Sequence, residues 1–246
     1  MYRFYVDNTI IHEDMISVTG SDVNHIKNVL RMKKGENLII CNGQGLDYYC
    51  IIDEICDSEI IVKVENKRES EAELPSNIYL FQGFPKKDKM ELIVQKAVEL
   101  GVYAVIPVMM KRTIVKLEDK KKELKKLERW QSIAEGAAKQ SGRGVIPQVH
   151  EVVTYKQAIE MAKELDIALL PYENANGIQH TKELIEQCIG KKSIGIFIGP
   201  EGGFELEEVE MAQNAKIEPV TLGKRILRTE TAGLTMLANL MFALEQ

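Results

Sequence analysis

Apolar and polar residues alternate in short runs over the first seventy residues of the chain. The alternation predicts strands over Glu36–Cys41, Leu46–Ile55 and Glu59–Val64. The turn-forming pairs Asn42-Gly43 and Asp57-Ser58 separate these runs. Three strands joined by short turns are typical of a small barrel or sandwich, so we expect a β domain in this part of the chain.

A helical pattern interrupts these strands. Ser21 is a suitable N-cap for a helix over Asp22–Met32. Residues with helical spacing predict its buried face, namely Val23, Ile26, Val29 and Leu30. The opposite face carries His25, Lys27 and Arg31.

The pattern changes near residue 70, where the charged segment Asn66–Pro75 is typical of a linker. Beyond it, apolar runs predict strands or extended pieces over residues 78–84, 102–109, 149–153, 167–170, 193–198 and 218–222. Amphipathic stretches predict helices over residues 88–100, 118–140, 156–165, 181–188, 205–215 and 230–244. Repeated strand–helix alternation predicts an α/β fold with a parallel sheet covered by helices on both faces. We therefore expect two domains, over residues 1–72 and 73–246.

The composition is that of a globular protein, with 28% charged and 45% hydrophobic residues among 246. The net charge of −5 argues against a generic nucleic-acid-binding protein, because such proteins are usually basic. However, the charge is unevenly distributed: residues 84–146 sum to +7, whereas residues 201–210 contain five glutamates. The average is therefore compatible with a local basic track that binds an anionic partner.

Several classes of protein are disfavoured. The longest apolar run, Val102–Met110, is much shorter than the about 20 residues that a membrane helix needs. Asp7, Glu13 and Asp14 stand where a secretory signal would be apolar, so we expect a cytoplasmic protein without a membrane partner. The four cysteines form no C-x-x-C pair, which favours buried free thiols over a metal site.

Candidate chemistry gathers in three loops that follow predicted strands. In open parallel sheets, ligands bind beyond the carboxyl ends of the strands. The three loops cover residues 170–173, 198–204 and 222–232. We expect them to meet at one edge of the sheet.

The second loop has an unusual backbone composition, with Gly199, Pro200, Gly202 and Gly203 within five positions. Glycine lets the main chain approach a ligand closely, although a tight turn without a ligand is the alternative. The spacing matches neither G-x-x-x-x-G-K-[ST] nor G-x-G-x-x-G. Glu201 would repel a phosphate, so the loop favours a neutral or cationic ligand.

The third loop is basic and leads into the last predicted helix. Three cations within five residues indicate an anionic partner such as RNA, namely Lys224, Arg225 and Arg228. Thr229 or Thr231 is expected to cap the helix, which places Glu230 in its first turn, where a carboxylate suits the helix dipole. A solvated basic loop and a purely structural Glu230 are the alternatives.

Two motifs carry a resemblance to a known family. The segment Ile198–Phe204 (IGPEGGF) with Glu207-Glu208, and the segment Leu222–Ala232 (LGKRILRTETA), resemble the small-subunit ribosomal RNA uridine-N3 methyltransferases of the SPOUT superfamily. Further matches run through nearly the whole chain, namely Arg3-Phe4-Tyr5, His25 with Val29-Leu30-Arg31, Lys89-Met90-Glu91, Gln95-Lys96, Glu99-Leu100-Gly101, Arg112 and Gln140-Ser141-Gly142-Arg143. Lys139 departs from the family, which usually has an acidic residue there, and Phe84–Asp88 varies the usual lead-in to the following helix.

The resemblance implies a fold and a cofactor. It implies a PUA-like β-barrel over residues 1–72 and a SPOUT-type α/β knot, which is a deep trefoil knot, over residues 73–246. The cofactor would be S-adenosyl-L-methionine, bent into a pocket between the three loops, with no metal. The implied cofactor-binding residues are Leu170, Pro171, Ile198, Gly199, Pro200, Glu201, Gly203, Leu222, Gly223, Ile226, Leu227, Thr229 and Thr231.

The implied reaction is methyl transfer to N3 of a specific uridine in 16S ribosomal RNA. Because N3–H is a weak acid, a base or an anion-stabilising cation is needed. We expect Arg228 to stabilise the negative charge on the uracil oxygens, and Glu230 or Glu201 to accept the proton. The candidate RNA-binding residues are Arg3, His25, Arg31, Lys89, Arg112, Arg143 and Arg225. A surface position or a structural ion pair is the alternative for each of them.

The expected partners follow from the same resemblance. The substrate would be 16S ribosomal RNA, either free or in the assembled small ribosomal subunit. The last helix is apolar on more than one face, and the family dimerises through the knot region and this helix, so we expect a homodimer. Three alternatives stay open: a SPOUT enzyme acting on another ribosomal or transfer RNA nucleotide, a non-catalytic RNA-binding relative, and a small-molecule enzyme.

Overall fold

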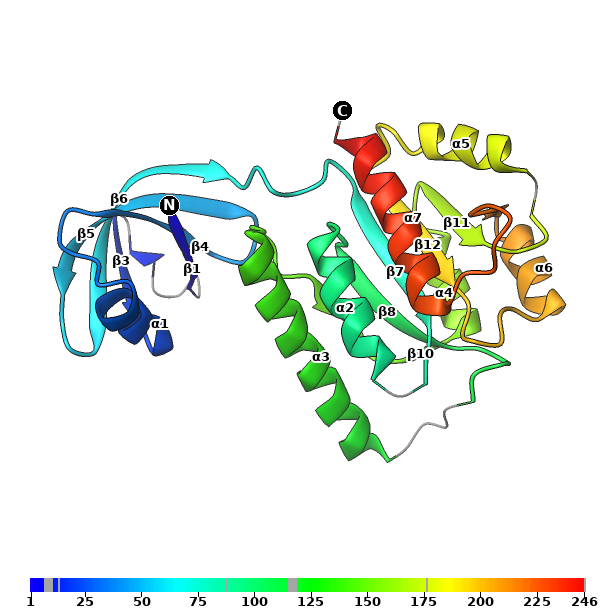
Figure 1. Ribbon diagram of the computed structural model, residues 1–246, viewed down its shortest axis with the longest axis horizontal. Helices are drawn as coiled ribbons and strands as arrows, with labels where there is room; N and C mark the ends of the chain where they lie inside the picture. The colour runs from blue at the N-terminus through cyan, green and yellow to red at the C-terminus, as the bar shows by residue number, and fades with distance from the viewer. Residues whose placement is uncertain (7–10, 13, 87, 115–118, 176, 246) are drawn as a thin grey trace. The chain divides into compact units, whose positions relative to one another are not determined.

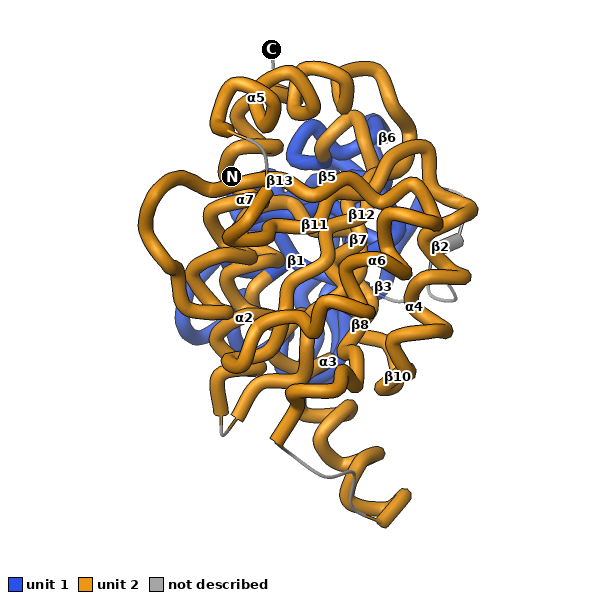
Figure 2. The backbone as a smooth tube through the Cα atoms, turned by 90° about the vertical axis from the view of Figure 1, so that its right-hand side faces the viewer, with its two compact units in different colours: residues 1–73, 138–146 blue, residues 74–137, 147–246 orange. Residues whose placement is uncertain are grey.

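The computed structural model describes residues 1–6, 11–12, 14–86, 88–114, 119–175 and 177–245. The chain forms two compact units, which Figure 2 draws in different colours. The first unit combines residues 1–73 with residues 138–146, and the second combines residues 74–137 with residues 147–246. The chain first passes from one unit to the other after residue 73, one residue beyond the predicted boundary after residue 72. Residues 138–146, which the sequence analysis placed in the second domain, group with the first unit.

The first unit is built on a six-stranded sheet in the order β1-β4-β5-β6-β3-β2. Its strands are β1 (Tyr2–Tyr5), β2 (Ile11–His12), β3 (Met15–Thr19), β4 (Asn37–Cys41), β5 (Leu46–Ile55) and β6 (Glu59–Glu69). The pairing of β1 with β4 is parallel and the other pairings are antiparallel. The three predicted strands are confirmed, whereas β1, β2 and β3 were not predicted as separate strands.

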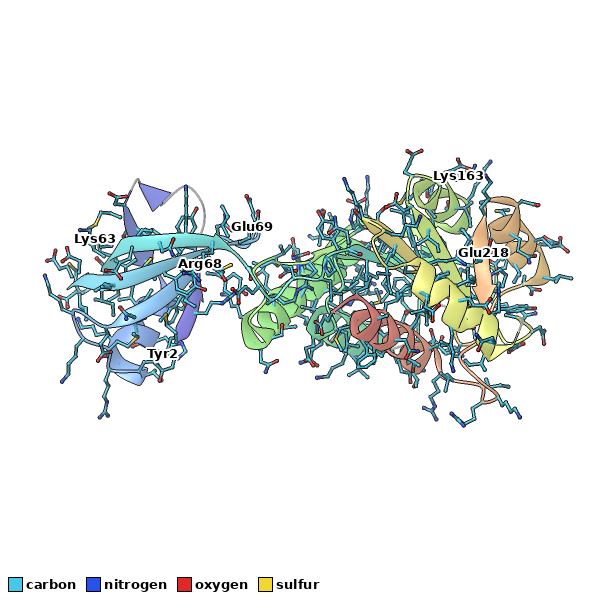
Figure 3. The ribbon with its side chains drawn as sticks, turned by 90° about the horizontal axis from the view of Figure 1, so that it is seen from above. Tyr2, Lys63, Arg68, Glu69, Lys163 and Glu218 are labelled. Carbon is cyan, nitrogen blue, oxygen red and sulfur yellow. The ribbon has the colours of Figure 1, made fainter. Side chains whose placement is uncertain are left out.

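The strand β6 is longer than its apolar pattern suggested. It continues through residues 66–69, which pair with residues 46–49 of β5, so the predicted linker begins too early. Lys63, Arg68 and Glu69 are labelled on this strand in Figure 3, and the Arg68 guanidinium carbon lies 5.4 Å from the ring centroid of Tyr49. The error arose because exposed polar residues of a paired strand have the same composition as a linker.

The predicted helix over residues 22–32 is shorter and of mixed type. It consists of α1 (Ser21–Asn24) and the π-helical segment η2 (His25–Val29). Ser21 lies inside α1 rather than capping it, because the N-cap residue is Gly20. A π-helix pairs residues five apart, so the positions at its end rotate away from the α-helical face. Val29, predicted to be inward, is 64% exposed as a result. The predicted inward residues Val23 and Ile26 are buried.

The second unit contains a parallel sheet in the order β10-β8-β7-β12-β11-β13, with β9 paired to β8. All strand pairings in the described part of this sheet are parallel. The strands are β7 (Asn77–Gly83), β8 (Ala104–Met109), β9 (Gln148–Val149), β10 (Val153–Thr154), β11 (Ile167–Pro171), β12 (Ser193–Ile198) and β13 (Ile217–Val220). The predicted α/β fold with a parallel sheet is confirmed.

Helices cover both faces of this sheet (Figure 1). The helices are α2 (Lys89–Glu99), α3 (Lys120–Ser141), α4 (Tyr155–Ala162), α5 (Ile178–Gln187), α6 (Leu206–Asn214) and α7 (Thr229–Leu244). The helix α7 contacts α2, β7 and β12, whereas α4 contacts α6 and β8. The predicted start of the long helix at Glu118 lies outside the described residues.

The core on the α4 side is aromatic. The rings of Phe81 and Phe197 stack with centroids 4.4 Å apart, and Tyr155 of α4 meets Phe197 edge-on. The buried Tyr155 hydroxyl donates a 2.8 Å hydrogen bond to the carbonyl oxygen of Glu208, which ties α4 to α6. Such packing holds the helices rigidly, so the loops at the strand ends start from fixed positions.

The cysteines are free, with Cys41, Cys50 and Cys188 buried and Cys56 half-buried. Burial raises the pKa of the Cys188 thiol to about 12, so this group is protonated at neutral pH. Within the described residues, no group of His, Cys, Asp and Glu side chains is arranged to hold a metal ion. The helices in that part of the chain are too short or too polar to cross a membrane.

Candidate active site

A cavity of about 560 Å³ opens where β11, β12 and β13 end. Its volume lies in the roughly 300–1,000 Å³ range of small-molecule sites. The three loops predicted to carry ligand chemistry all contribute to its walls. The lining includes eleven of the predicted cofactor residues, namely Pro171, Ile198, Gly199, Pro200, Glu201, Gly203, Leu222, Gly223, Ile226, Leu227 and Thr229.

Two predicted cofactor residues do not line the cavity. Leu170 is fully buried inside β11, and Thr231 is exposed on α7. Several further residues line the cavity that were not predicted to bind the cofactor, namely Tyr172, Glu173, Gly202, Phe204, Thr221, Lys224 and Ala232. These residues lie within or next to the three predicted loops. Membership of a loop is therefore the sequence signal that could have identified them.

Glycines let the wall of the cavity form. Gly83 ends β7, and a Cβ atom added to it would lie 2.5 Å from the backbone nitrogen of Pro200. No larger residue allows the loop after β12 to pass so close to β7. Within that loop Gly203 has a φ of 70°, a left-handed conformation that glycine adopts without strain. Its N–H donates a 2.9 Å hydrogen bond to the Pro200 carbonyl, which closes the turn.

One lysine joins two carboxylates beside the cavity. The Nζ atom of Lys89 lies 3.0 Å from Oε2 of Glu230 and 3.3 Å from Oε1 of Glu201. The backbone N–H of Lys86 also donates a 3.0 Å hydrogen bond to Glu201. Burial raises the pKa of each carboxyl group, but hydrogen bonds from backbone N–H groups and from Lys89 outweigh it, so both pKa values are lowered. Both glutamates are therefore ionised at neutral pH.

Replacing Lys89 with methionine is expected to make stability less sensitive to acid. A lowered folded-state pKa contributes stability above the unfolded value near 4.5, and this contribution is lost as the pH falls through the folded value. Without Lys89 the two carboxyl groups lose a cation that lowers their pKa values. The variant therefore loses less stability than wild type when the pH falls. Denaturant unfolding between about pH 3 and pH 7 should give a flatter profile for Lys89→Met than for wild type.

The matched control is Lys96→Met, because Lys96 is on the same helix and pairs with Glu99 away from the cavity. The control should keep the acid dependence of the wild type. A wild-type slope in the Lys89→Met variant would contradict the assignment of Lys89 as the partner of both glutamates.

The first turn of α7 carries the basic end of the third loop. Arg228, not Thr229 or Thr231, is the N-cap residue, and no side-chain cap hydrogen bond forms at this described helix end. The predicted threonine cap is therefore wrong: Thr229 is already helical and its hydroxyl points to Gly199, 2.6 Å from the carbonyl oxygen. The exposed Arg228 lines the cavity, and Glu230 lies in the first turn as predicted.

The predicted RNA-binding residue Arg112 holds the glycine-rich loop. Its guanidinium donates to the Gly202 carbonyl at 2.8 Å and makes two hydrogen bonds to the Glu205 carboxylate, at 2.8 and 3.2 Å. The neighbouring backbone N–H of Lys111 donates to Glu208. Arg112 thus connects the segment after β8 to the loop after β12. Of the other predicted RNA-binding residues in the second unit, Lys89 and Arg225 line the cavity.

The remaining candidates belong to the first unit. Arg3 forms a 2.7 Å ion pair with Asp47, and Arg143 is 3% exposed and paired with Glu73. Both thus have the structural ion pairs that were the alternative to RNA binding. His25 and Arg31 are exposed, and the His25 ring meets Phe4 edge-on at 5.9 Å.

Comparison with known proteins agrees with this arrangement. Residues 72–241 match a family described as an RNA methyltransferase domain, and residues 18–65 match an RNA methyltransferase PUA domain. The chain is 36% identical over 251 residues to the ribosomal RNA small subunit methyltransferase E of Bacillus subtilis, with 100% of this chain and 98% of the relative covered. It is 33% identical to the protein of the same name from Mesomycoplasma hyopneumoniae, with 97% and 98% covered.

A solved structure shows the same relationship. The crystal structure of a ribosomal RNA small subunit methyltransferase E from Neisseria gonorrhoeae, bound to S-adenosyl methionine, superposes with a TM-score of 0.80 at 31% identity. The match covers 98% of this chain and 97% of that structure. Together, the parallel sheet, the cavity at its carboxyl edge and the two family matches define an RNA methyltransferase with a PUA domain. The chain belongs to the ribosomal RNA small subunit methyltransferase E family.

Proposed function

We propose that this protein transfers a methyl group from S-adenosylmethionine to N3 of a specific uridine in 16S ribosomal RNA. The observation that carries this proposal is the cavity, whose lining combines glycine-rich backbone and an ionised glutamate with an exposed arginine. The names of the full-length relatives support ribosomal RNA of the small subunit as the substrate.

The residues present fit the cofactor. The sulfonium of S-adenosylmethionine is cationic and supplies an electrophilic methyl group. The ionised Glu201 favours a cation in the cavity, whereas it would repel a phosphate. Gly199, Gly203, Leu222 and Leu227 line the cavity, and their backbone polar groups are the candidates to contact adenine and ribose.

Arg228 stabilises the uracil anion in this proposal. Removing the N3 proton places negative charge on the flanking uracil oxygens, and a guanidinium offers N–H donors aimed at that charge. Arg228 is exposed at the cavity, where a splayed base can reach it. Together with Lys224 and Arg225 it forms a cationic rim that attracts the RNA backbone.

Of the two glutamates considered for proton transfer, Glu201 lines the cavity and is the candidate that a substrate can reach. Glu230 is half-buried and bonded to Lys89, so we propose that it orients Lys89 and not that it accepts the proton. Lys89 in turn helps to keep Glu201 ionised.

We further propose that the first unit closes as a PUA-like β-barrel that binds RNA, and that the second unit contains the deep trefoil knot of SPOUT enzymes. The PUA match over residues 18–65 supports the first statement. The shared cavity of the loops after β11, β12 and β13 supports the second. Because its substrate is ribosomal RNA, free or in an assembled small subunit, the enzyme works in the cytoplasm.

A homodimer through α7 is part of the proposal. The helix leaves Phe242 79% exposed, and α2, which packs beside it, leaves Leu92 45% exposed. An exposed apolar patch on a terminal helix is typical of a surface that a second copy covers. Light scattering at micromolar concentration should therefore give twice the chain mass for wild type. Phe242→Asp should give the mass of a single chain, because it buries a charge in the contact.

The control for this prediction is Leu206→Asp on α6, where Leu206 is 63% exposed. This variant should stay dimeric. A monomeric wild type, or a dimeric Phe242→Asp variant, would contradict the proposed contact.

Mapping of methylated bases tests the proposed reaction. Small-subunit RNA from cells with and without the protein should differ by one N3-methyluridine, and the purified enzyme should restore it. Loss of a different modified nucleotide would move the protein to another RNA target. An unchanged methylation pattern would favour a non-catalytic RNA-binding relative.

A further inference from the structure

A glutamine is buried at the carboxyl end of the central strand β7. Gln82 is 0% exposed, in a sheet whose neighbouring positions are apolar. Burying an amide in such surroundings is unfavourable unless it is hydrogen-bonded. Its Nε2 atom donates to the Gly83 carbonyl at 3.0 Å and to Oγ1 of Thr229 at 2.8 Å. Gln82 therefore connects β7 to the first residue of α7.

The direction of these hydrogen bonds is determined by chemistry. The Gly83 carbonyl can only accept, so the Gln82 amide must present its nitrogen there. The Thr229 hydroxyl accepts from Gln82, so its own hydrogen is directed to the Gly199 carbonyl, 2.6 Å away. A relay therefore runs from the Gln82 amide through the Thr229 hydroxyl to the Gly199 carbonyl.

The relay leaves one polar atom unsatisfied. Within the described part of the chain, Oε1 of Gln82 is buried without a hydrogen-bond partner. A leucine would fill the same space without that penalty. Packing alone therefore does not explain a glutamine at this position. Its contribution to the structure is the two hydrogen bonds that its Nε2 atom donates.

The relay ends at the walls of the cavity. Gly199 and Thr229 both line it, and Thr229 stands between Arg228 and Glu230 on the chain. Because the single hydrogen of the Thr229 hydroxyl is used on Gly199, this hydroxyl has no hydrogen to donate to a cofactor. The Thr229 hydroxyl therefore holds the protein backbone at Gly199 and can meet a cofactor only as a hydrogen-bond acceptor.

We propose that Gln82 and Thr229 are positioning residues that hold the Gly199 loop and the first turn of α7 in register around the S-adenosylmethionine site. This inference rests on the proposed role of the cavity. When the relay is broken, the Gly199 carbonyl and the Arg228 guanidinium lose their fixed separation. Cofactor affinity and turnover then both fall, because one end of the relay shapes the binding wall and the other carries the proposed anion-stabilising cation.

Three variants test the relay. Thr229→Val keeps the shape of the side chain but lacks the hydroxyl, Gln82→Met lacks the donor nitrogen, and Thr229→Ser keeps the hydroxyl. Titration calorimetry with S-adenosylmethionine should show affinity reduced by about tenfold in the first two, the effect of one lost hydrogen bond. Their kcat for methylation of small-subunit RNA should also fall. Thr229→Ser should keep both the cofactor affinity and kcat close to the wild-type values.

The matched control is Ser76→Ala. Ser76 is 4% exposed directly before β7, at the opposite end of the strand, and its hydroxyl donates a 2.6 Å hydrogen bond to the Lys191 carbonyl. The control loses a buried hydrogen bond of the same kind, so thermal unfolding should show a lowered Tm. Its cofactor affinity and kcat should stay at wild-type values, which separates positioning from a general loss of stability.

Hydrogen exchange distinguishes failure of the relay from failure of the proposed site. In the wild type, S-adenosylmethionine should protect the backbone of residues 199–204 and 222–228. If it protects neither loop, the proposed cavity is wrong and the relay with it. If it protects both loops, but Thr229→Val and Gln82→Met bind and turn over like the wild type, the cavity stands and the relay is overturned. An equal loss of affinity in Ser76→Ala would also overturn it.

Discussion

Replacing Arg228 with alanine is expected to lower kcat for RNA methylation by at least about 100-fold while leaving the affinity for S-adenosylmethionine largely intact. The guanidinium is exposed at the cavity, so its removal does not disturb packed neighbours. The loss should appear in kcat because the negative charge on the uracil oxygens develops only as the proton leaves. Single-turnover methylation and calorimetry with the cofactor measure the two quantities separately.

The companion variant is Lys224→Ala. Lys224 is an exposed cation in the same loop and also lines the cavity. We expect it to raise KM for RNA and to reduce the salt dependence of binding, with kcat unchanged, because a backbone phosphate contact adds affinity and no chemistry. If Arg228→Ala behaves like Lys224→Ala, Arg228 binds RNA only. Normal turnover in Arg228→Ala would contradict its proposed catalytic role.

Replacing Glu73 with alanine is expected to destabilise the first unit by about 3–5 kcal/mol, the range found when one partner of a buried ion pair is removed. The Glu73 carboxylate accepts hydrogen bonds from the backbone N–H groups of Gly144 and Val145, at 2.9 and 3.0 Å. It also accepts two from the Arg143 guanidinium, which is nearly fully buried. The variant removes all four contacts and leaves a buried cation without its carboxylate.

Urea denaturation measures this effect, with Glu71→Ala as the control because Glu71 is exposed two residues away. The control should change the unfolding free energy by less than about 0.5 kcal/mol. We expect residues 138–146 to lose hydrogen-exchange protection in Glu73→Ala, since Glu73 binds this segment directly. A loss below about 1 kcal/mol would mean that the pair contributes no more than a surface salt bridge.

The relation between Lys89 and its two glutamates changes how the site is understood. From the sequence, Lys89 was expected to contact RNA, and Glu230 or Glu201 to accept the proton. In the structure the three side chains form one ionic cluster, in which Lys89 is 30% exposed and the glutamates are more buried. Hydrogen bonds from backbone N–H groups and from Lys89 lower the pKa of Glu201, so this carboxylate is ionised across the neutral range.

Local pattern was sufficient to predict most elements of the fold. The strand over Ser193–Ile198 was predicted with its observed bounds, because an apolar run between turn residues depends only on neighbours along the chain. The π-helical segment His25–Val29 was missed, because the sequence there carries an α-helical apolar spacing and only the packed structure widens the turn. The polar end of β6 was missed because its pairing with β5, not its composition, makes it a strand.

The sequence by itself determined the order of strands and helices, the parallel sheet and the three loops that carry the candidate chemistry. Each of these depends on periodicity, turn residues or glycines that are read within a few positions. Only the tertiary structure decided which side chains meet: Lys89 with Glu230, 141 residues apart, Gln82 with Thr229, 147 residues apart, and Arg143 with Glu73. Such contacts depend on how the strands stack and where the helices pack against them. The sequence therefore shows which charged and polar residues are present, and the packing of the fold determines which of them are buried and which partner each of these finds.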